Sequence, residues 1–363
     1  MVVAQPQVER RAHVRPAFID CDFHNQWDSP KDLYKYLSRR WVDHIETFGL
    51  RGHAGGTYPR FLEDKAGTWP PSGRRAASEP QFVKDTFLDP ERVAYAILTP
   101  LGGGQGLANL DLAAAWATAV NDWQTAEWLD FDPRFRGSIQ IPAEDAARSV
   151  SEIRRLAARD KRWVQVQFSG RPHEPMGRRR YWPIFEACAE YGLHVMSHAF
   201  GSYGQPITGT GWPSFYVDDH VGPSQAMQAS ALSMVAEGVF EHFPRVKLVS
   251  AENGFAWFTS LGWRMDSAWH LLKQEIPHLK RLPSEVLAEN LFVCTQPMEE
   301  PETAKAFHQM LEHFGPAIDR ILFATDYPHW DADDPDLAFP VPIAPALQQK
   351  LYFDNAARLY GLS

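Results

Sequence analysis

The chain has 363 residues, of which 44% are hydrophobic and 22% charged, and its formal net charge is −9. This composition excludes global disorder, because it supplies enough apolar surface for a sizeable core. The negative charge argues against binding to nucleic acid or anionic lipid, which both require a basic surface, so we expect a small-molecule substrate. No apolar run reaches the ~18 residues that a membrane helix needs, and the N-terminus lacks the apolar core of a signal peptide. A cytoplasmic location is therefore expected.

Short apolar segments alternate with longer helical patterns along the chain, which is typical of parallel α/β folds. The segments expected to form strands are residues 17–20, 93–98, 135–141, 163–168, 194–198, 247–251, 291–295 and 321–324. The helices expected between them are residues 110–129, 143–159, 181–191, 225–240, 256–272 and 302–313. Eight strands are the number of a TIM barrel, so we predict a (β/α)8 fold of the α/β class.

Two segments interrupt this alternation. Residues 51–80 follow the first expected strand, and residues 199–223 follow the fifth; both are rich in Gly and Pro. Long segments of this kind in a compact domain are usually functional or mobile. We predict that both are loop insertions over the catalytic face of the barrel. Residues 1–16 are expected to be an N-terminal extension, and residues 17–363 one barrel domain.

The first chemically informative motif is FIDCDFH, residues 18–24, at the end of the first strand. Strand side chains alternate between faces, so Asp20, Asp22 and His24 share a face and can all point into the barrel. Buried carboxylates without partners are costly, so acids in such a place usually bind a metal or an ion-pair partner.

Two further motifs end strands in the same way. His198 ends the fifth strand, and Asp326 directly follows the eighth, whereas His194 begins the fifth strand and is expected to be structural. In a closed barrel the carboxyl ends of all strands meet at one mouth, where barrel enzymes keep their catalytic groups. The sequence therefore predicts a site that combines the first, fifth and eighth strands.

These motifs resemble the amidohydrolase-related enzymes called amidohydrolase family 2, which include the aminocarboxymuconate semialdehyde decarboxylase group. The resemblance spans residues 18–362 and rests on FIDCDFH, HVMSHAFG, EGVFEHFPRVKLVSAENGFAWF, ILFATDYPHWD and FDNAARLYGL. It implies one divalent metal held by Asp22, His24, His198 and Asp326. Carboxylates with two imidazoles suit zinc or manganese and leave a coordination position for water or substrate. The resemblance also leaves a homo-oligomer open.

The sequence departs from the family's decarboxylases after the sixth strand, where Glu252 stands in place of a usual histidine. A carboxylate is a poor acid near neutral pH unless burial raises its pKa. We therefore expect Glu252 or Asp326 to accept a proton from metal-activated water, and predict a hydrolase of a small, aromatic or carboxylate-bearing molecule. The alternative is a metal-dependent, non-oxidative decarboxylase. A catalytically silent metal-binding barrel is a third reading, against which the complete ligand set argues.

Four other residues are candidates for the site. His220, in the loop after the fifth strand, could supply the missing catalytic imidazole. His329, three residues after Asp326, is expected to bind substrate or to orient that carboxylate. Trp257 lies near the motif of the sixth strand and is expected to line an aromatic pocket. His53 opens the first long loop, where the resemblance implies contacts with substrate.

Overall fold

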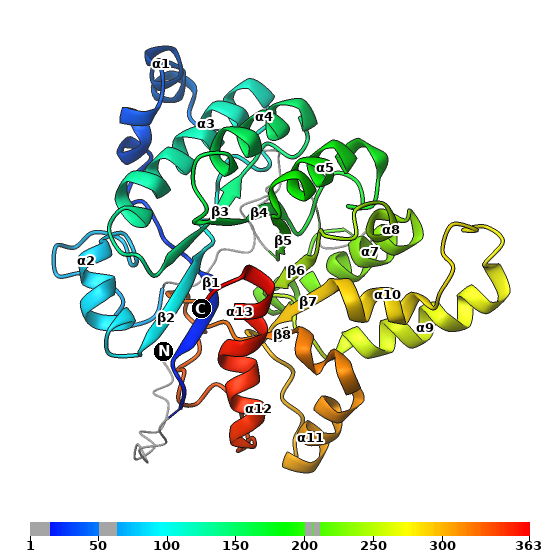
Figure 1. Cartoon of the computed structure of the whole chain (residues 1–363). Coiled ribbons are helices and arrows are strands. Elements are labelled where there is room, and N and C mark those ends of the chain that lie inside the picture. Colours follow the sequence, from blue (N-terminus) through cyan, green and yellow to red (C-terminus); the bar gives the residue numbers. More distant parts are fainter. Residues whose placement is uncertain (1–14, 51–63, 200–205, 207–210) are drawn as a thin grey trace.

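The computed structural model describes residues 15–50, 64–199, 206 and 211–363. Its eight strands are all parallel and pair in sequential order to form one sheet, with the helices packed around it (Figure 1). The strands are β1 Phe18–Phe23, β2 Val93–Leu98, β3 Phe135–Gln140, β4 Trp163–Ser169, β5 His194–His198, β6 Leu248–Ala251, β7 Leu291–Cys294 and β8 Ile321–Leu322. The TIM-barrel prediction is confirmed.

The first and last strands come together at the closure of the barrel. Cys21 N donates to the carbonyl oxygen of Phe323 at 3.0 Å, and His24 N donates to that of Tyr327 at 2.8 Å. Phe23 and Tyr327 also form a parallel bridge. Because of this closure, the end of β1 and the segment after β8 lie side by side.

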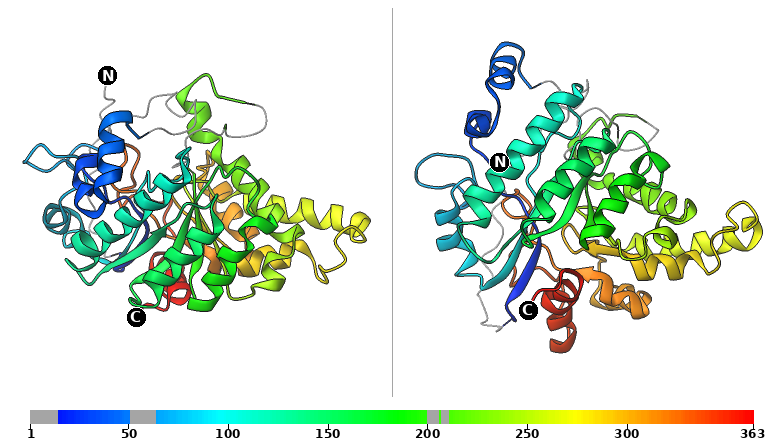
Figure 2. Two further views of the ribbon diagram at one scale, coloured as in Figure 1. Left: turned by 90° about the horizontal axis from the view of Figure 1, so that it is seen from above. Right: turned by 45° about the horizontal axis from the view of Figure 1, so that its top comes forward.

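The helices lie around the sheet and range from four to 16 residues (Figure 2). They are α1 Arg39–Phe48, α2 Pro80–Val83, α3 Leu110–Trp123, α4 Ala146–Ala157, α5 Trp182–Tyr191, α6 Tyr216–Val221, α7 Pro223–Ala236, α8 Val239–His242, α9 Trp257–Leu272, α10 Pro283–Asn290, α11 Ala304–His313, α12 Pro345–Gln349 and α13 Asn355–Tyr360. The prediction of a single helix over residues 225–240 is wrong, because the structure has two helices there, α7 and α8. Gly238, with φ of 79°, ends α7 in the left-handed conformation and separates it from α8.

Two apolar clusters fill the molecule. The larger one lies mainly between the sheet and the helices, and the smaller one joins side chains from seven of the strands, including Ile19, Met196 and Leu322. Only the barrel interior brings so many strands together. Leu359 and Tyr360 of α13 pack against this inner cluster, and the Leu359 carbonyl oxygen lies 2.8 Å from His194 Nε2. One end of the barrel is thereby covered, which leaves the carboxyl ends of the strands for the polar residues.

Some expectations about the chain's organisation stay predictions. The extension over residues 1–16 is described only from residue 15, and the two loop insertions are described only in part. No helix among the described residues is both long and apolar enough to cross a membrane.

Candidate metal centre

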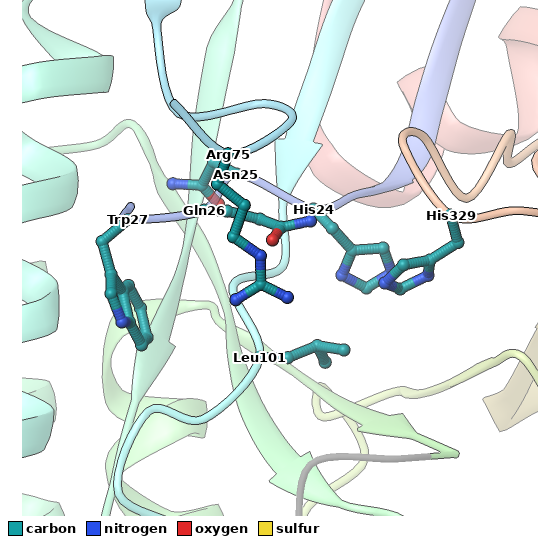
Figure 3. Close-up of a pocket in the computed structure, with 7 residues that line it drawn as sticks. All are labelled: His24, Asn25, Gln26, Trp27, Arg75, Leu101 and His329. Carbon is teal, nitrogen blue, oxygen red and sulfur yellow. The ribbon is translucent and has the colours of Figure 1, made fainter. Parts of the chain in front are cut away.

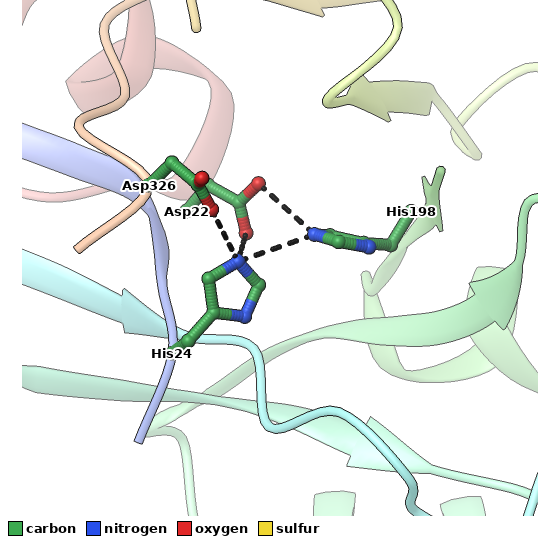
Figure 4. A group of neighbouring side chains, drawn as sticks. All are labelled: Asp22, His24, His198 and Asp326. Atoms are coloured by element: carbon green, nitrogen blue, oxygen red, sulfur yellow. Dashed lines mark hydrogen bonds and ion pairs between the residues drawn. The ribbon is translucent and has the colours of Figure 1, made fainter. Parts of the chain in front are cut away.

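Four side chains from three separate motifs converge at the mouth of the barrel (Figure 4). Asp22 belongs to β1, His24 directly follows it, His198 ends β5, and Asp326 follows β8. All four are buried, and one potential ligand atom from each lies within 4.8 Å of the others. The structure thus brings together the ligand set expected from the sequence.

The spacing of these atoms suits a shared cation. His24 Nε2 lies 3.2 Å from His198 Nε2 and 2.8 Å from Asp326 Oδ1. Ligand atoms bonded to one metal at roughly 2.0–2.2 Å are themselves roughly 3 Å apart. Asp326 Oδ2 is buried and accepts no hydrogen bond from the described residues, which is costly for a carboxylate unless a cation is present. The residues therefore fit a divalent metal.

Thr99, directly after β2, orients two of these ligands. His24 Nδ1 lies 2.6 Å from the Thr99 carbonyl oxygen. A carbonyl can only accept, so Nδ1 carries the proton and Nε2 presents its lone pair to the other ligands. Thr99 Oγ1 donates to Asp22 Oδ1 at 2.5 Å. Such partners fix the ring's tautomer and orientation and tune metal affinity.

Asp20 is separated from the ligands although it precedes Asp22 by only two residues. Its carboxylate accepts hydrogen bonds from Thr325 Oγ1 at 2.5 Å and from Thr325 N at 3.0 Å. Burial raises the pKa of Asp20 to about 7 against the opposing effect of these hydrogen bonds. Asp20 thereby links β1 to the segment that carries Asp326.

Glu252 and Asp326 both have strained backbones. Their φ angles are 54° and 60°, in the left-handed region that non-glycine residues seldom adopt. Such conformations cost on the order of 1–3 kcal/mol each and gather at functional sites. The strain places both carboxylates at the mouth of the barrel.

Glu252 and His329 adjoin the four ligands. Glu252 Oε2 lies 3.4 Å from His198 Nε2, and Glu252 Oε1 lies 3.3 Å from His329 Nδ1. His329 Nδ1 is also 2.7 Å from Asp326 Oδ1. His24, Glu252, Asp326 and His329 form a second group whose ligand atoms lie within 4.8 Å of one another. The geometry places both predicted residues beside the centre, while their roles stay predictions.

The pKa values of the ligands diverge because their surroundings differ. Burial lowers the pKa of His24 to about 3. Burial also acts to lower the pKa of His198, but the charges of Glu252 and Asp22 outweigh it and raise this pKa to about 9. Burial acts to raise the pKa of Asp22, whereas His198 and His24 lower it to about 2. In the metal-free protein at neutral pH, His198 is therefore the positively charged imidazolium, whereas His24 is neutral and keeps its single proton on Nδ1.

The remaining predicted residues lie farther out. His220 Nε2 pairs with Asp331 Oδ2 at 2.9 Å, and this contact is the main cause of its raised pKa, to which Glu252 and Asp326 also contribute. The carboxylates of the metal centre therefore affect the pKa of His220, although its direct partner is Asp331. The indole of Trp257 is buried and donates to the carbonyl oxygens of Asn253 and Gly254, in the turn after Glu252.

His53 lies outside the described residues, so its expected contact with substrate stays a prediction.

A pocket of about 330 Å³, part of it open to solvent, lies beside His24 and His329 (Figure 3). It is also lined by Asn25, Gln26, Trp27, Arg75 and Leu101. The Arg75 guanidinium points into the pocket and forms no ion pair with the described residues. Its neighbour Arg74 instead pairs with Asp32 at 2.6 Å. Sequence reasoning missed Arg75, because only its place in the first long loop set it apart.

The family model described as Amidohydrolase matches residues 19–362. The chain belongs to this family. It is therefore a metal-dependent hydrolase or carboxy-lyase, and the predicted enzyme class and divalent metal are confirmed at this level. None of the curated proteins matches the chain.

Several solved structures share the fold. An amidohydrolase from Mycobacterium avium subsp. paratuberculosis K-10 is 21% identical with a TM-score of 0.70, over 95% of this chain and 99% of that one. A 5-carboxyvanillate decarboxylase from Sphingomonas paucimobilis is 19% identical with a TM-score of 0.67, over 96% and 99%. A dihydroxybenzoic acid decarboxylase from Polaromonas sp. JS666, crystallised with manganese and 2-nitroresorcinol, is 17% identical with a TM-score of 0.65, over 95% and 97%.

Replacing His198 by alanine is expected to reduce bound metal from about one ion per chain to near zero, because it removes a ligand at the centre of the cluster. Elemental analysis of the purified variant measures this. His194→Gln is the matched control, since His194 lies at the other end of the same strand and contacts Leu359. Full metal content in the His198 variant would contradict the ligand assignment.

Metal affinity is expected to rise with pH. His198, with a pKa of about 9, must lose its proton to bind metal, so the apparent affinity for Mn²⁺ should increase by roughly tenfold per pH unit between pH 6 and pH 8. Calorimetry in two buffers with different ionisation enthalpies should detect about one released proton at pH 7. An affinity that does not vary over this range would show that His198 is not protonated in the free site.

Proposed function

We propose that the chain is a metal-dependent, non-oxidative decarboxylase of a small aromatic acid. The observation that carries this proposal is the entry of the Arg75 guanidinium into the pocket that His24 and His329 line (Figure 3). Arginine binds carboxylates through paired hydrogen bonds, and the Trp27 indole offers an apolar wall for a ring. Such a pocket draws an aromatic anion toward the metal ligands.

Glu252 offers a source for the proton that decarboxylation requires. The residue is 5% exposed, and its Oε2 accepts no hydrogen bond from the residues that the structure describes, although it lies 3.4 Å from His198 Nε2. Burial and the charge of Asp326 raise the pKa of Glu252. A carboxylic acid with a raised pKa can donate a proton in place of the family's usual histidine. The absence of that histidine is therefore no longer a reason to prefer hydrolysis.

The mechanism follows from these positions. A divalent metal bound by Asp22, His24, His198 and Asp326 would supply a Lewis acid for the substrate's carboxylate and an adjacent oxygen. Arg75 holds the anion in the pocket. Glu252 delivers the proton on Oε2 to the ring carbon that bears the carboxylate. The bond from that carbon to the carboxylate then breaks, its electron pair returns to the ring, and carbon dioxide leaves. Glu252 regains a proton from solvent.

The compared structures support the same reaction class. The Sphingomonas and Polaromonas proteins are decarboxylases of aromatic acids, and the latter was crystallised with manganese. Their low identity establishes only the shared fold, so the pocket of this chain supplies the argument for its substrate. The absence of nucleic-acid binding, the cytoplasmic location and a homo-oligomer stay predictions.

Hydrolysis is the second candidate, and one observation favours it. Glu252 lies beside the metal ligands and Asp326 is one of them; both carboxylates are buried, and either can accept a proton from an attacking water. The His329 imidazole, 2.7 Å from Asp326, would then hold that carboxylate in place. The products distinguish the two reactions. The silent-barrel reading requires that no substrate is turned over by metal-loaded protein.

Mn²⁺-loaded protein is expected to release carbon dioxide from 2-hydroxybenzoates and, in D₂O, to place deuterium on the carbon that lost the carboxylate. Glu252→Gln should lower kcat by about 10²- to 10⁴-fold, because the variant cannot donate the proton. Glu241→Gln, on the exposed side of α8, is the control. Incorporation of oxygen from water into a product, without carbon dioxide, would establish hydrolysis instead.

Arg75→Gln is expected to raise KM for aromatic acids by roughly 10- to 100-fold with little change in kcat, the effect of losing a charged hydrogen bond to the bound anion. Steady-state kinetics measure both constants. Arg74→Gln is the matched control, because it removes the neighbouring guanidinium that pairs with Asp32 outside the pocket. Equal effects of the two substitutions would mean that Arg75 acts only through the general charge of the surface.

A further inference from the structure

The loop of residues 99–106, which follows β2, connects the metal centre to the pocket. At its start, Thr99 contacts both His24 and Asp22. Two residues later, Leu101 lines the pocket, and in the view of Figure 3 it lies below the Arg75 guanidinium. A displacement of this loop would therefore change the pocket wall and the support of two ligands together.

The loop follows a path that glycine permits. Gly102, Gly104 and Gly106 have φ angles of 79°, 99° and 80°. Gly103 packs directly on a buried side chain, since a Cβ atom there would lie 2.1 Å from Gln140 Oε1. The backbone of the loop is thus pressed against the end of β3.

Three buried glutamine side chains hold the loop in this position. Gln105 Nε2 donates to Gln140 Oε1 at 2.9 Å, and Gln140 Nε2 donates to Gln167 Oε1 at 2.6 Å. Gln167 Nε2 donates to the Pro100 carbonyl oxygen at 3.4 Å. This series, here called the amide clasp, begins at Gln105 and ends at Pro100, so both of its ends are on the same loop.

The direction of the amide clasp is determined by chemistry. The Pro100 carbonyl can only accept, so the Gln167 amide must turn its nitrogen toward it and its oxygen toward Gln140. The same orientation then passes through Gln140 to Gln105. Gln140 is further held by Asn121 of α3, which bonds to both its backbone N and its backbone O. Each of the three side-chain amides thereby forms at least one hydrogen bond within the clasp, which a buried polar network requires.

We propose that Gln140 and Gln167 are positioning residues that set the substrate pocket through the loop of residues 99–106. The amide clasp holds Leu101 against the pocket and Thr99 against the metal ligands. It thereby limits the size of the substrate's aromatic ring that fits beside His24. The part of this inference that concerns a ring rests on the proposed function, whereas the part that concerns the loop and the metal does not.

The test compares Gln140→Met with Gln165→Met. Methionine keeps the length of glutamine but can neither donate nor accept these hydrogen bonds. Gln165 is an equally buried glutamine on β4, bonded to Ser138 Oγ at 2.9 Å and to Tyr360 OH at 2.7 Å, with Tyr360 on the helix that covers the other end of the barrel. Both variants lose buried hydrogen bonds, but only the first opens the clasp.

Hydrogen exchange of the peptide covering residues 99–109 is expected to be about tenfold faster in Gln140→Met and unchanged in Gln165→Met. In the first variant the Kd for Mn²⁺ and the Kd of Mn²⁺-loaded protein for salicylate should each rise by about 10- to 100-fold. Adding Gln105→Met should produce little further change, because it removes the same hydrogen bond. Gln105→Met alone, a change within the loop, repeats the test if Gln140→Met does not fold.

Two results would overturn the proposal. One is unchanged exchange in the loop when the clasp is opened. The other is an equal loss of Mn²⁺ affinity in Gln140→Met and Gln165→Met, which would mean that the clasp contributes only to the general stability of the fold. If the wild-type protein binds Mn²⁺ but not salicylate, the proposed function fails, and the exchange and Mn²⁺ comparisons still decide the role of the clasp.

Discussion

The burial of ionisable groups at one point of the barrel is the constraint on which the rest of the structure depends. Three carboxylates and three imidazoles meet there: Asp22, Glu252, Asp326, His24, His198 and His329. Such a cluster is unfavourable unless each group is paired and a cation balances the carboxylates. Several features meet this requirement: the contacts of Thr99 with His24 and Asp22, the hydrogen bonds between Asp20 and Thr325, and the left-handed backbones of Glu252 and Asp326. Much of the fold near β1, β2 and β8 is therefore arranged around charge.

The sequence predicted the barrel, and the meeting of the four candidate ligands at its mouth, for a physical reason. Strands buried on both faces appear as continuous apolar runs, and residues that end such strands must meet at the barrel mouth. The alternation of the strand did not distinguish Asp20 from Asp22, which only the resemblance singled out, because the register of β1 against β2 shifts between Asp20 and Phe23. Arg75 and Leu101 could not be identified either. They lie in irregular loops, where side-chain direction depends on contacts distant in sequence, such as that between Gln105 and Gln140.

Glu252 shows how an environment can change the chemistry of a residue type. In the sequence it is a departure from the family's decarboxylases and favours a base. In the structure its carboxyl group is almost fully enclosed and faces Asp326, which disfavours its charged form. The same side chain therefore suits an acid once its surroundings are known. Its neighbours, and not the residue type alone, determine how readily Glu252 holds a proton.

The left-handed backbones of Glu252 and Asp326 have a consequence for the evolution of this chain. At these positions asparagine or glycine would relieve conformational strain and also remove a buried charge. Loss of catalysis would thus bring a gain in folding stability, so selection for activity alone must retain both carboxylates. A lineage released from that selection should drift toward glycine or asparagine here first. Among relatives that share both carboxylates, a change to glycine or asparagine at either position would therefore mark a barrel that persists only as a fold.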